Sequence, residues 1–326
     1  MRRREKKAAC RRAAGLCLTL VLAFSLCGCA GKENRKAYVA VITKSTMSTF
    51  WKTVFAGAEA AATEYNLSIT CDGPKLEEDY EKQNQLVKKA MEDGAEVIVF
   101  SAVDYNANAA VINEAAQRGI KIVVIDSDVN SDQVSCRIGT DNVQAGRKTA
   151  EAALAAEAEE LYVGIVNYDA GSANGQEREQ GFREVMEESE RVKEITTINV
   201  VSTTEDAREG ARELIRSNPE INVIVTFNEW TSLGVGWAIR DMEAADRIHV
   251  VAFDSNAVSV GMLETGEVDA LIVQNPYAMG YLGVEAASAL IKGQSMPQSR
   301  VDTAAMIATR ENMFSEECQK MLFFFD

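Results

Sequence analysis

The residues of this sequence best suited to chemistry are polar side chains that directly follow short apolar runs. They include carboxylates, amides, hydroxyls and an amine: Lys44 and Ser45, Ser101 and Asp104, Asp126 and Ser127, Asp169, Thr203 to Glu205, Asn228 and Glu229, Asp254 and Ser255, Gln274 and Asn275. A carboxylate accepts hydroxyl protons and an amide both donates and accepts, so this mixture suits a polyhydroxylated, neutral molecule. The alternative interpretation is that Asp, Asn and Ser at these places cap the helix that follows.

The apolar runs have the length and composition of buried strands. They cover residues 39–43, 67–71, 97–100, 120–125, 137–139, 161–166, 195–201, 223–227, 249–253 and 270–273. Segments with helical spacing separate most of them, as in the apolar stripe between Met279 and Ile291. Strands that are apolar on both faces and alternate with amphipathic helices indicate parallel sheets covered on both sides. About five strand–helix units lie on each side of Thr140, which predicts two similar doubly wound α/β lobes.

The position of the polar residues follows from this fold class. In an open parallel sheet, ligands bind outside the carboxyl ends of the strands, where helix N-termini also present free N–H groups. Two such edges facing each other predict one polar cleft between the lobes.

Composition and motifs exclude several function classes. The chain has 326 residues and a formal charge of −15, although seven of its basic residues lie within the first 28 positions. The rest of the chain is therefore strongly acidic and repels phosphate backbones, and we expect no nucleic-acid partner. A single His and the absence of GxSxG, HExxH and GxxxxGK[ST] motifs argue against an enzyme, a metal centre or a cofactor. A hydrolase with Asp126 and Asp254 as paired carboxylates is the remaining enzyme alternative.

The N-terminus has the pattern of an export signal. A positive head at 2–12 precedes fourteen mostly apolar residues at 13–26, too few to span a bilayer. Leu26-Cys27-Gly28-Cys29 resembles the bacterial lipobox, which implies that Cys29 becomes the acylated N-terminus, with palmitate among its fatty acids. We expect a signal peptide at 1–28, a lipidated tether at 29–37, and anchoring on the extracytoplasmic face of the cell membrane. A plain secretory signal or a single-span anchor is the alternative.

The order of several segments between Tyr38 and about Gly293 resembles the ribose-type, type I periplasmic sugar-binding proteins, which are the solute receptors of ABC importers. The segments are Tyr38-Val-Ala-Val-Ile-Thr with Phe50-Trp51, Ile122-Val-Val-Ile-Asp126, Gly139-Thr-Asp-Asn142 with Gly146, Glu177-Arg-Glu-Gln-Gly181-Phe182, Phe227-Asn228 with Leu233-Gly234, Val251-Ala-Phe-Asp254, and Gln274-Asn-Pro276 with Gly280.

The resemblance implies two lobes that close around a ligand by hinge bending. The three crossovers would lie near Thr140–Asp141, Gln274–Asn275 and Thr303. Lobe 1 is then 38–140 plus 275–303, and lobe 2 is 141–274 plus 304–326.

The resemblance also implies site residues. Phe50 and Trp51 would stack on a sugar ring, while Asp126, Asn228, Asp254 and Gln274 would bind its hydroxyls. Lys44 and Ser48 flank the aromatic pair. The alternative roles are core packing for the aromatic pair, helix capping for the two aspartates and a hinge contact for Gln274.

Three positions depart from the family pattern. Ser127 and Gln176 stand where ribose-binding relatives carry arginines, and Glu205 lies near the position of an aromatic cover. Arg178 is two residues beyond Gln176, and its direction is open. Losing two cations favours a neutral ligand over an anionic one.

These observations predict a lipid-anchored solute-binding protein that captures a small neutral sugar or polyol and delivers it to an ABC permease. We expect a monomer. The alternative is a receptor that signals to a membrane sensor kinase or chemoreceptor. A sugar-responsive repressor of the LacI type is excluded, because an export signal occupies the place of its DNA-binding helices.

Overall fold

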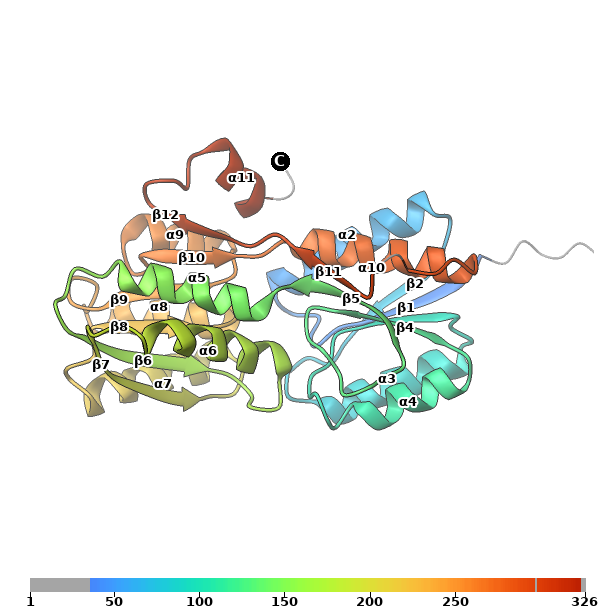
Figure 1. The fold of residues 1–326 in the computed structure, drawn as a ribbon, viewed down its shortest axis with the longest axis horizontal. Coiled ribbons are helices and arrows are strands. Elements are labelled where there is room, and N and C mark those ends of the chain that lie inside the picture. Colours follow the sequence, from blue (N-terminus) through green and yellow to red (C-terminus); the bar gives the residue numbers. More distant parts are fainter. Residues whose placement is uncertain (1–35, 297, 324–326) are drawn as a thin grey trace, which may run out of the picture. The chain divides into compact units, whose positions relative to one another are not determined.

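The computed structural model describes residues 36–296 and 298–323, and the fold begins at Ala37. The predicted signal peptide, Cys29 and most of the tether lie outside the described residues. From Ala37 onward the chain forms two α/β lobes, each built on a six-stranded sheet (Figure 1). The predicted fold class is confirmed.

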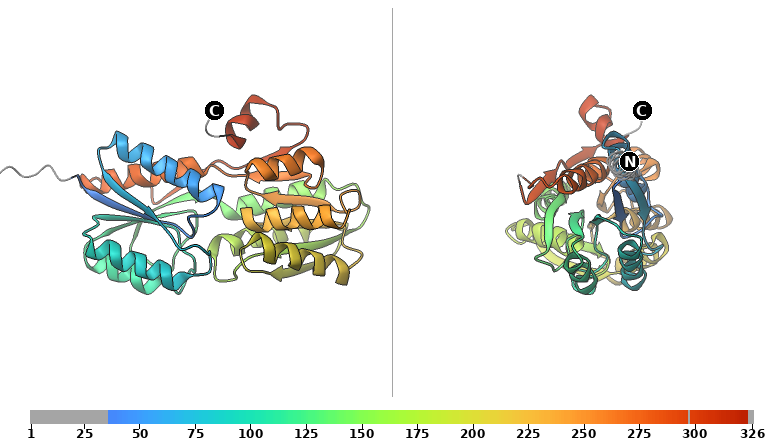
Figure 2. Two further views of the ribbon diagram at one scale, coloured as in Figure 1. Left: turned by 180° about the vertical axis from the view of Figure 1, so that it is seen from behind. Right: turned by 90° about the vertical axis from the view of Figure 1, so that its right-hand side faces the viewer.

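The sheet of the first lobe has the strand order β11-β5-β4-β3-β1-β2, and all neighbouring strands are parallel. Its strands are β1 (Tyr38–Ile42), β2 (Ser68–Asp72), β3 (Val97–Phe100), β4 (Lys121–Ile125), β5 (Val134–Thr140) and β11 (Arg300–Thr303). Helices α2 (Thr49–Glu64) and α10 (Pro276–Ile291) pack together on one face, and α3 (Tyr80–Glu92) and α4 (Ala109–Gln117) cover the other (Figure 2).

Strand β3 illustrates why both faces of this sheet are covered. Val97 and Val99 contribute to the core under α2 and α10, whereas Ile98 and Phe100 contribute to the core on the α3 and α4 side. Successive side chains of a strand point to opposite faces, so a strand that is apolar at every position needs helices on both sides.

The second lobe repeats this arrangement with the strand order β12-β10-β9-β8-β6-β7. Its strands are β6 (Leu161–Asn167), β7 (Val192–Asn199), β8 (Val223–Thr226), β9 (His249–Phe253), β10 (Ala270–Val273) and β12 (Met306–Thr309), of which only β12 is antiparallel to its neighbour. Its helices are α5 (Asn142–Leu154), α6 (Ala173–Met186), α7 (Thr204–Ser217), α8 (Glu229–Asp241), α9 (Ala257–Thr265) and α11 (Glu316–Leu322). Helices α5 and α6 cover one face, and α7, α8 and α9 cover the other.

The chain passes between the two sheets three times: after β5, after β10, and between β11 and β12. Strands β11 and β12 were not predicted from the sequence. Each has only four residues and is partly exposed, so neither has the apolar run of a buried strand.

Close contact between α5 and α6 fixes the position of α6. A Cβ atom added at Gly146 would lie 2.0 Å from the Arg178 carbonyl oxygen, and one at Gly181 would lie 2.0 Å from the Val143 carbonyl oxygen. Only glycine allows the two backbones to approach so closely. This contact holds Arg178 in place for the site described below.

Two further observations concern the described residues only. Cys71, Cys136 and Cys318 are free thiols. Across the same part of the chain, no helix combines the length and apolar character that a bilayer crossing requires.

Candidate ligand-binding site

A cavity lies where the carboxyl ends of the strands of both lobes meet. Its walls carry aromatic, carboxylate, amide and cationic side chains: Lys44, Ser48, Phe50, Trp51, Glu77, Asp126, Tyr168, Asn174, Arg178, Asn228, Glu229, Trp230, Asp254 and Gln274. The cavity is narrow, at about 20 Å³ on a scale where one water molecule needs about 10–15 Å³. A larger ligand therefore requires the lobes or these side chains to move apart.

Arg178 is the buried cation at the centre of this site. Its guanidinium donates to Asn142 Oδ1 at 3.0 Å, to the Phe227 carbonyl at 2.6 Å and to Gln274 Oε1 at 3.0 Å. It also lies 3.5 Å from Asp126 Oδ1. The sequence leaves the direction of Arg178 open, and the structure shows that it points into the site, where Lys44 supplies a second buried cation.

Asp126 follows β4, and both of its carboxylate oxygens already accept hydrogen bonds. Asn174 Nδ2 donates to both of its carboxylate oxygens, at 3.1 and 3.0 Å, and the Ser101 hydroxyl donates to Oδ2 at 3.1 Å. Asn174 lies on α6, so it joins the second lobe to a carboxylate of the first. Asp126 precedes a turn into β5 and does not cap a helix.

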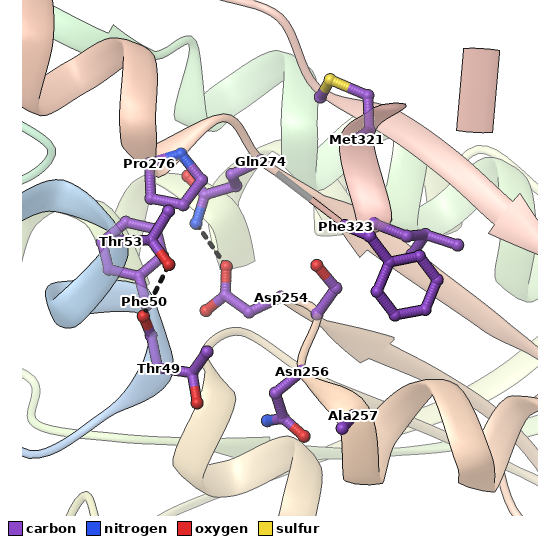
Figure 3. A pocket seen from close by; sticks show the side chains of 12 residues that line it. Thr49, Phe50, Thr53, Asp254, Asn256, Ala257, Gln274, Pro276, Met321 and Phe323 are labelled. Atoms are coloured by element: carbon purple, nitrogen blue, oxygen red, sulfur yellow. Dashed lines mark hydrogen bonds between the residues drawn. The ribbon is translucent and has the colours of Figure 1, made fainter. Parts of the chain in front are cut away.

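Asp254 follows β9 and has an open acceptor. Gln274 Nε2 donates to its Oδ1 at 2.7 Å (Figure 3), whereas Oδ2 has no hydrogen-bond partner among the described residues. Burial raises the pKa of this carboxyl group to about 7, while Arg178 and the Gln274 hydrogen bond oppose the rise. Asn256, not Asp254, caps α9. Of the two aspartates, Asp254 is thus the one with a free oxygen that can accept a hydrogen bond from a hydroxyl group.

Gln274 links the hinge to the site. Its Oε1 accepts from the Thr140 hydroxyl at 2.7 Å and from Arg178, while its Nε2 donates to Asp254. Thr140 and Gln274 stand at two of the three passages between the sheets. The side chain of Gln274 therefore makes a contact at the hinge and also lines the cavity.

Lys44 is buried beyond the end of β1. Its Nζ donates to the Ser172 hydroxyl at 2.6 Å and lies 4.9 Å from the centre of the Tyr168 ring. Both partners belong to the second lobe, so Lys44 bridges the cleft.

The aromatic pair at the start of α2 belongs both to the core and to the cavity wall. Phe50 and Trp51 are almost fully buried and meet edge to face, with ring centres 4.9 Å apart. Trp51 Nε1 donates to Glu77 Oε1 at 2.6 Å, and Glu77 Oε2 accepts from the Ser202 hydroxyl at 3.1 Å. Glu77 thereby ties this wall to the second lobe.

Glu229 closes the cleft on another side. Its carboxylate accepts from the backbone N–H groups of Thr49 at 3.2 Å and Phe50 at 2.9 Å, which open α2, and from Asn256 Nδ2 at 3.0 Å. A carboxylate at a helix N-terminus is favoured by the helix dipole. Asn228 beside it lines the cavity and also caps α8.

Three predicted residues lie away from the cavity wall. Ser127 is buried inside the first lobe, and its hydroxyl has no hydrogen-bond partner among the described residues. Gln176 is exposed, because two residues along a helix turn a side chain to the opposite side from Asn174 and Arg178. Glu205 is exposed in the first turn of α7, where its charge suits the helix N-terminus.

Several cavity residues were not chosen from the sequence: Glu77, Tyr168, Asn174 and Trp230. Glu229 was named with Asn228 among the polar residues that follow a predicted strand, but it was not among the residues expected to bind the ligand. Asn174 and Arg178 are four residues apart and share one helix face, a detectable pattern. Glu77 lies five residues after β2 in an acidic loop, and no local signal marks it. The described residues contain no group of three His, Cys, Asp or Glu side chains arranged to hold a metal ion.

Sequence comparison assigns this architecture to a family. The profile of the periplasmic binding protein domain matches residues 39–295. The chain belongs to the periplasmic binding protein family. Its members are binding proteins, and the chain is accordingly a binding protein and not an enzyme.

Individual periplasmic binding proteins resemble the chain over most of their length. The D-allose-binding periplasmic protein of Escherichia coli is 26% identical over 259 residues, which cover 76% of this chain and 83% of the relative. A carbohydrate transporter solute-binding protein from Agrobacterium radiobacter, solved in complex with D-arabinose, is 28% identical with a TM-score of 0.86, covering 89% of this chain and all of that one. An ABC transporter solute-binding protein from Agrobacterium vitis with bound D-fucose is 26% identical with a TM-score of 0.85, covering 88% and 100%.

Proposed function

We propose that this periplasmic binding protein captures a small neutral sugar or polyol between its lobes and delivers it to an ABC transporter. The observation that carries the proposal is the cavity between the lobes, where aromatic rings, two aspartates, three amides and two buried cations converge. The similar proteins named above bind D-allose, D-arabinose and D-fucose, which supports a sugar ligand here.

The proposed recognition uses two kinds of surface. Phe50 and Trp51 provide aromatic carbon for the C–H face of a sugar ring. Asp254 Oδ2 accepts a ring hydroxyl, and Arg178 and Lys44 donate to ring or hydroxyl oxygens. Asp126, Asn228 and Gln274 complete the proposed set.

Binding is coupled to movement of the lobes. We assign lobe 1 to residues 38–140 and 275–303 and lobe 2 to residues 141–274 and 304–326. A ligand that touches both lobes favours their closed arrangement, because its contacts are complete only there. The closed arrangement is the form that the membrane partner recognises.

A melting-temperature assay tests this function. A panel of pentoses, hexoses and polyols is added to the purified protein, and at least one compound should raise its melting temperature by several degrees. Asp254→Ala and Trp51→Ala should abolish the rise, whereas Asp246→Ala at an exposed position should retain it. A panel in which no compound raises the melting temperature would contradict the proposal.

Lipid anchoring is part of the same proposal. Cys29 would carry the diacylglyceryl group that holds the protein on the extracytoplasmic face of the cell membrane. In cells, the wild-type chain should fractionate with membranes and incorporate labelled palmitate. Cys29→Ser should lose the label, and a label retained in that variant would exclude Cys29 as the anchor.

A further inference from the structure

A second hollow opens beside the proposed sugar cavity, and the inference drawn from it rests on the function proposed above. This side pocket has a volume of about 220 Å³ and lies between the start of α2, the loop after β9 and the end of α11. On the same scale the sugar cavity measures about 20 Å³. The side pocket is therefore about ten times larger than the sugar cavity that it adjoins.

The two hollows share a wall. Phe50, Asp254 and Gln274 line both of them. Figure 3 shows Asp254 between Phe50 and Phe323, with Gln274 bonded to one of its carboxylate oxygens. A ring hydroxyl bound at the open Oδ2 of Asp254 would thus stand at the boundary between the hollows. A substituent on that side of the ring would extend into the side pocket.

The walls of the side pocket suit a second ring. Phe50, Pro276, Met321 and Phe323 contribute carbon surfaces, and Thr53 and Asn256 add polar groups. Phe323 keeps 40% of its surface exposed, so its ring is available to a ligand. Aromatic faces bind the C–H faces of sugars and the faces of other rings. Asp254 is the only charged residue among the described residues of this lining, and its carboxylate disfavours an anionic substituent.

We propose that the ligand is a glycoside with a ring in its aglycone. Its sugar ring occupies the cavity between the lobes, and the second ring occupies the side pocket against Phe323. The recognised class is therefore larger than a free monosaccharide.

Calorimetry with matched glycosides tests this proposal. The base sugar is whichever of D-glucose, D-galactose, D-allose, D-ribose and D-arabinose raises the melting temperature most. The probes are its methyl and phenyl glycosides in both anomeric forms. One phenyl glycoside should bind about tenfold more tightly than the matching methyl glycoside, because only the phenyl ring reaches the side pocket.

Variants of residues that line the side pocket test whether the tighter binding of the phenyl glycoside arises there. Phe323→Ala should remove the phenyl advantage and leave affinity for the free sugar unchanged. Thr53→Trp, which fills the pocket from α2, should do the same. Phe314→Ala is the matched control, because Phe314 is 73% exposed and lies outside the pocket lining.

Three outcomes overturn the proposal, and they are distinguishable. Equal affinity for phenyl and methyl glycosides in the wild type overturns the second-ring site alone, as does an advantage that survives both variants. Absence of binding by every sugar and glycoside overturns the proposed function as well.

Discussion

Asp126 and Asp254 occupy equivalent positions in the two lobes. Each is the first residue after the strand that stands third in its sheet, β4 in one lobe and β9 in the other. Each has a left-handed backbone, with φ of 55° and 68°. Each donates its N–H to the neighbouring strand, Asp126 to the Ile138 carbonyl at 3.1 Å and Asp254 to the Ile272 carbonyl at 2.9 Å. A non-glycine residue in this conformation costs about 1–3 kcal/mol and is concentrated at functional sites.

The surroundings of the two aspartates differ. Asn174 and Ser101 donate to Asp126, and Arg178 lies beside it. Asp254 receives one hydrogen bond, from Gln274. The two aspartates therefore have different roles. Asp126 links the two lobes through Asn174, and Asp254 has an oxygen free to accept a hydrogen bond from a ligand.

The raised pKa of Asp254 predicts how stability depends on pH. Its carboxyl group has a pKa of about 7 in the folded protein and an ordinary value of 3.8, because burial disfavours its charge. Between these values the folded state binds the extra proton, so this group lowers the free energy of unfolding as the pH rises. Asp254→Asn should therefore be more stable than the wild type at pH 8, on the order of 4 kcal/mol, and the difference should shrink toward pH 4. Urea unfolding at both pH values measures it, and a difference that is constant with pH would contradict the account.

The same group predicts a pH-dependent affinity. A sugar hydroxyl donates to the ionised form of Asp254, whose fraction rises about tenfold between pH 6 and pH 8 for a pKa near 7. The wild-type affinity for a neutral sugar should rise by about that factor in calorimetric titrations. Asp254→Asn should bind weakly with no such dependence. A flat wild-type profile would exclude Asp254 as an acceptor.

Arg178 should be required for stability as well as for binding. Arg178→Met retains the length of the side chain but leaves Asp126 as a buried charge without its cation, which costs about 3–5 kcal/mol. Arg118→Met is the control, because its ion pair with Glu114 is exposed and contributes less than about 1 kcal/mol. Urea unfolding compares the two variants. Similar small losses in both would show that the buried network does not depend on Arg178.

Gly181 tests whether the contact between α5 and α6 positions the site. Gly181→Ala forces the helices apart at the Val143 carbonyl and should destabilise the protein by about 1–3 kcal/mol. Ligand affinity should fall too, because Asn174 and Arg178 move with α6. Gly261→Ala on α9 meets no atom within 4 Å and should be neutral or stabilising by up to about 1 kcal/mol. Unchanged affinity in Gly181→Ala would separate the helix contact from the site.

Glu229 tests the link between closure and affinity. Glu229→Gln replaces an acceptor oxygen facing the N-terminus of α2 with an amide group, so one N–H of α2 loses its partner. Sugar affinity should drop about tenfold, and scattering should show a more open ligand-bound protein. Glu220→Gln, at an exposed position, is the control. Wild-type affinity in Glu229→Gln would mean that this contact does not hold the closed form.

The sequence predicts most of this fold because buried parallel strands are apolar at every position. Strand β3 is predicted in this way, and the apolar stripe between Met279 and Ile291 predicts helix α10. Strands β11 and β12 do not, since each becomes a strand only by pairing with a distant partner, β5 and β10 respectively.

The site is predictable to a similar extent. The strand-end rule selects Asp126, Asn228, Asp254 and Gln274, and all four line one cavity. Gln176 was chosen from the resemblance and does not line this cavity, because a residue on a helix faces a site only at three- or four-residue intervals. Glu77 comes from a loop, whose path is set by tertiary contacts with Trp51 and Ser202.

A crystal structure of the protein grown with the sugar that raises its melting temperature most tests the central claim directly. We predict a sugar ring against Trp51, with a hydroxyl about 2.6–3.2 Å from Asp254 Oδ2 and an oxygen within the same distance of Arg178. A sugar bound outside the space between the lobes, or one that touches neither side chain, would contradict it.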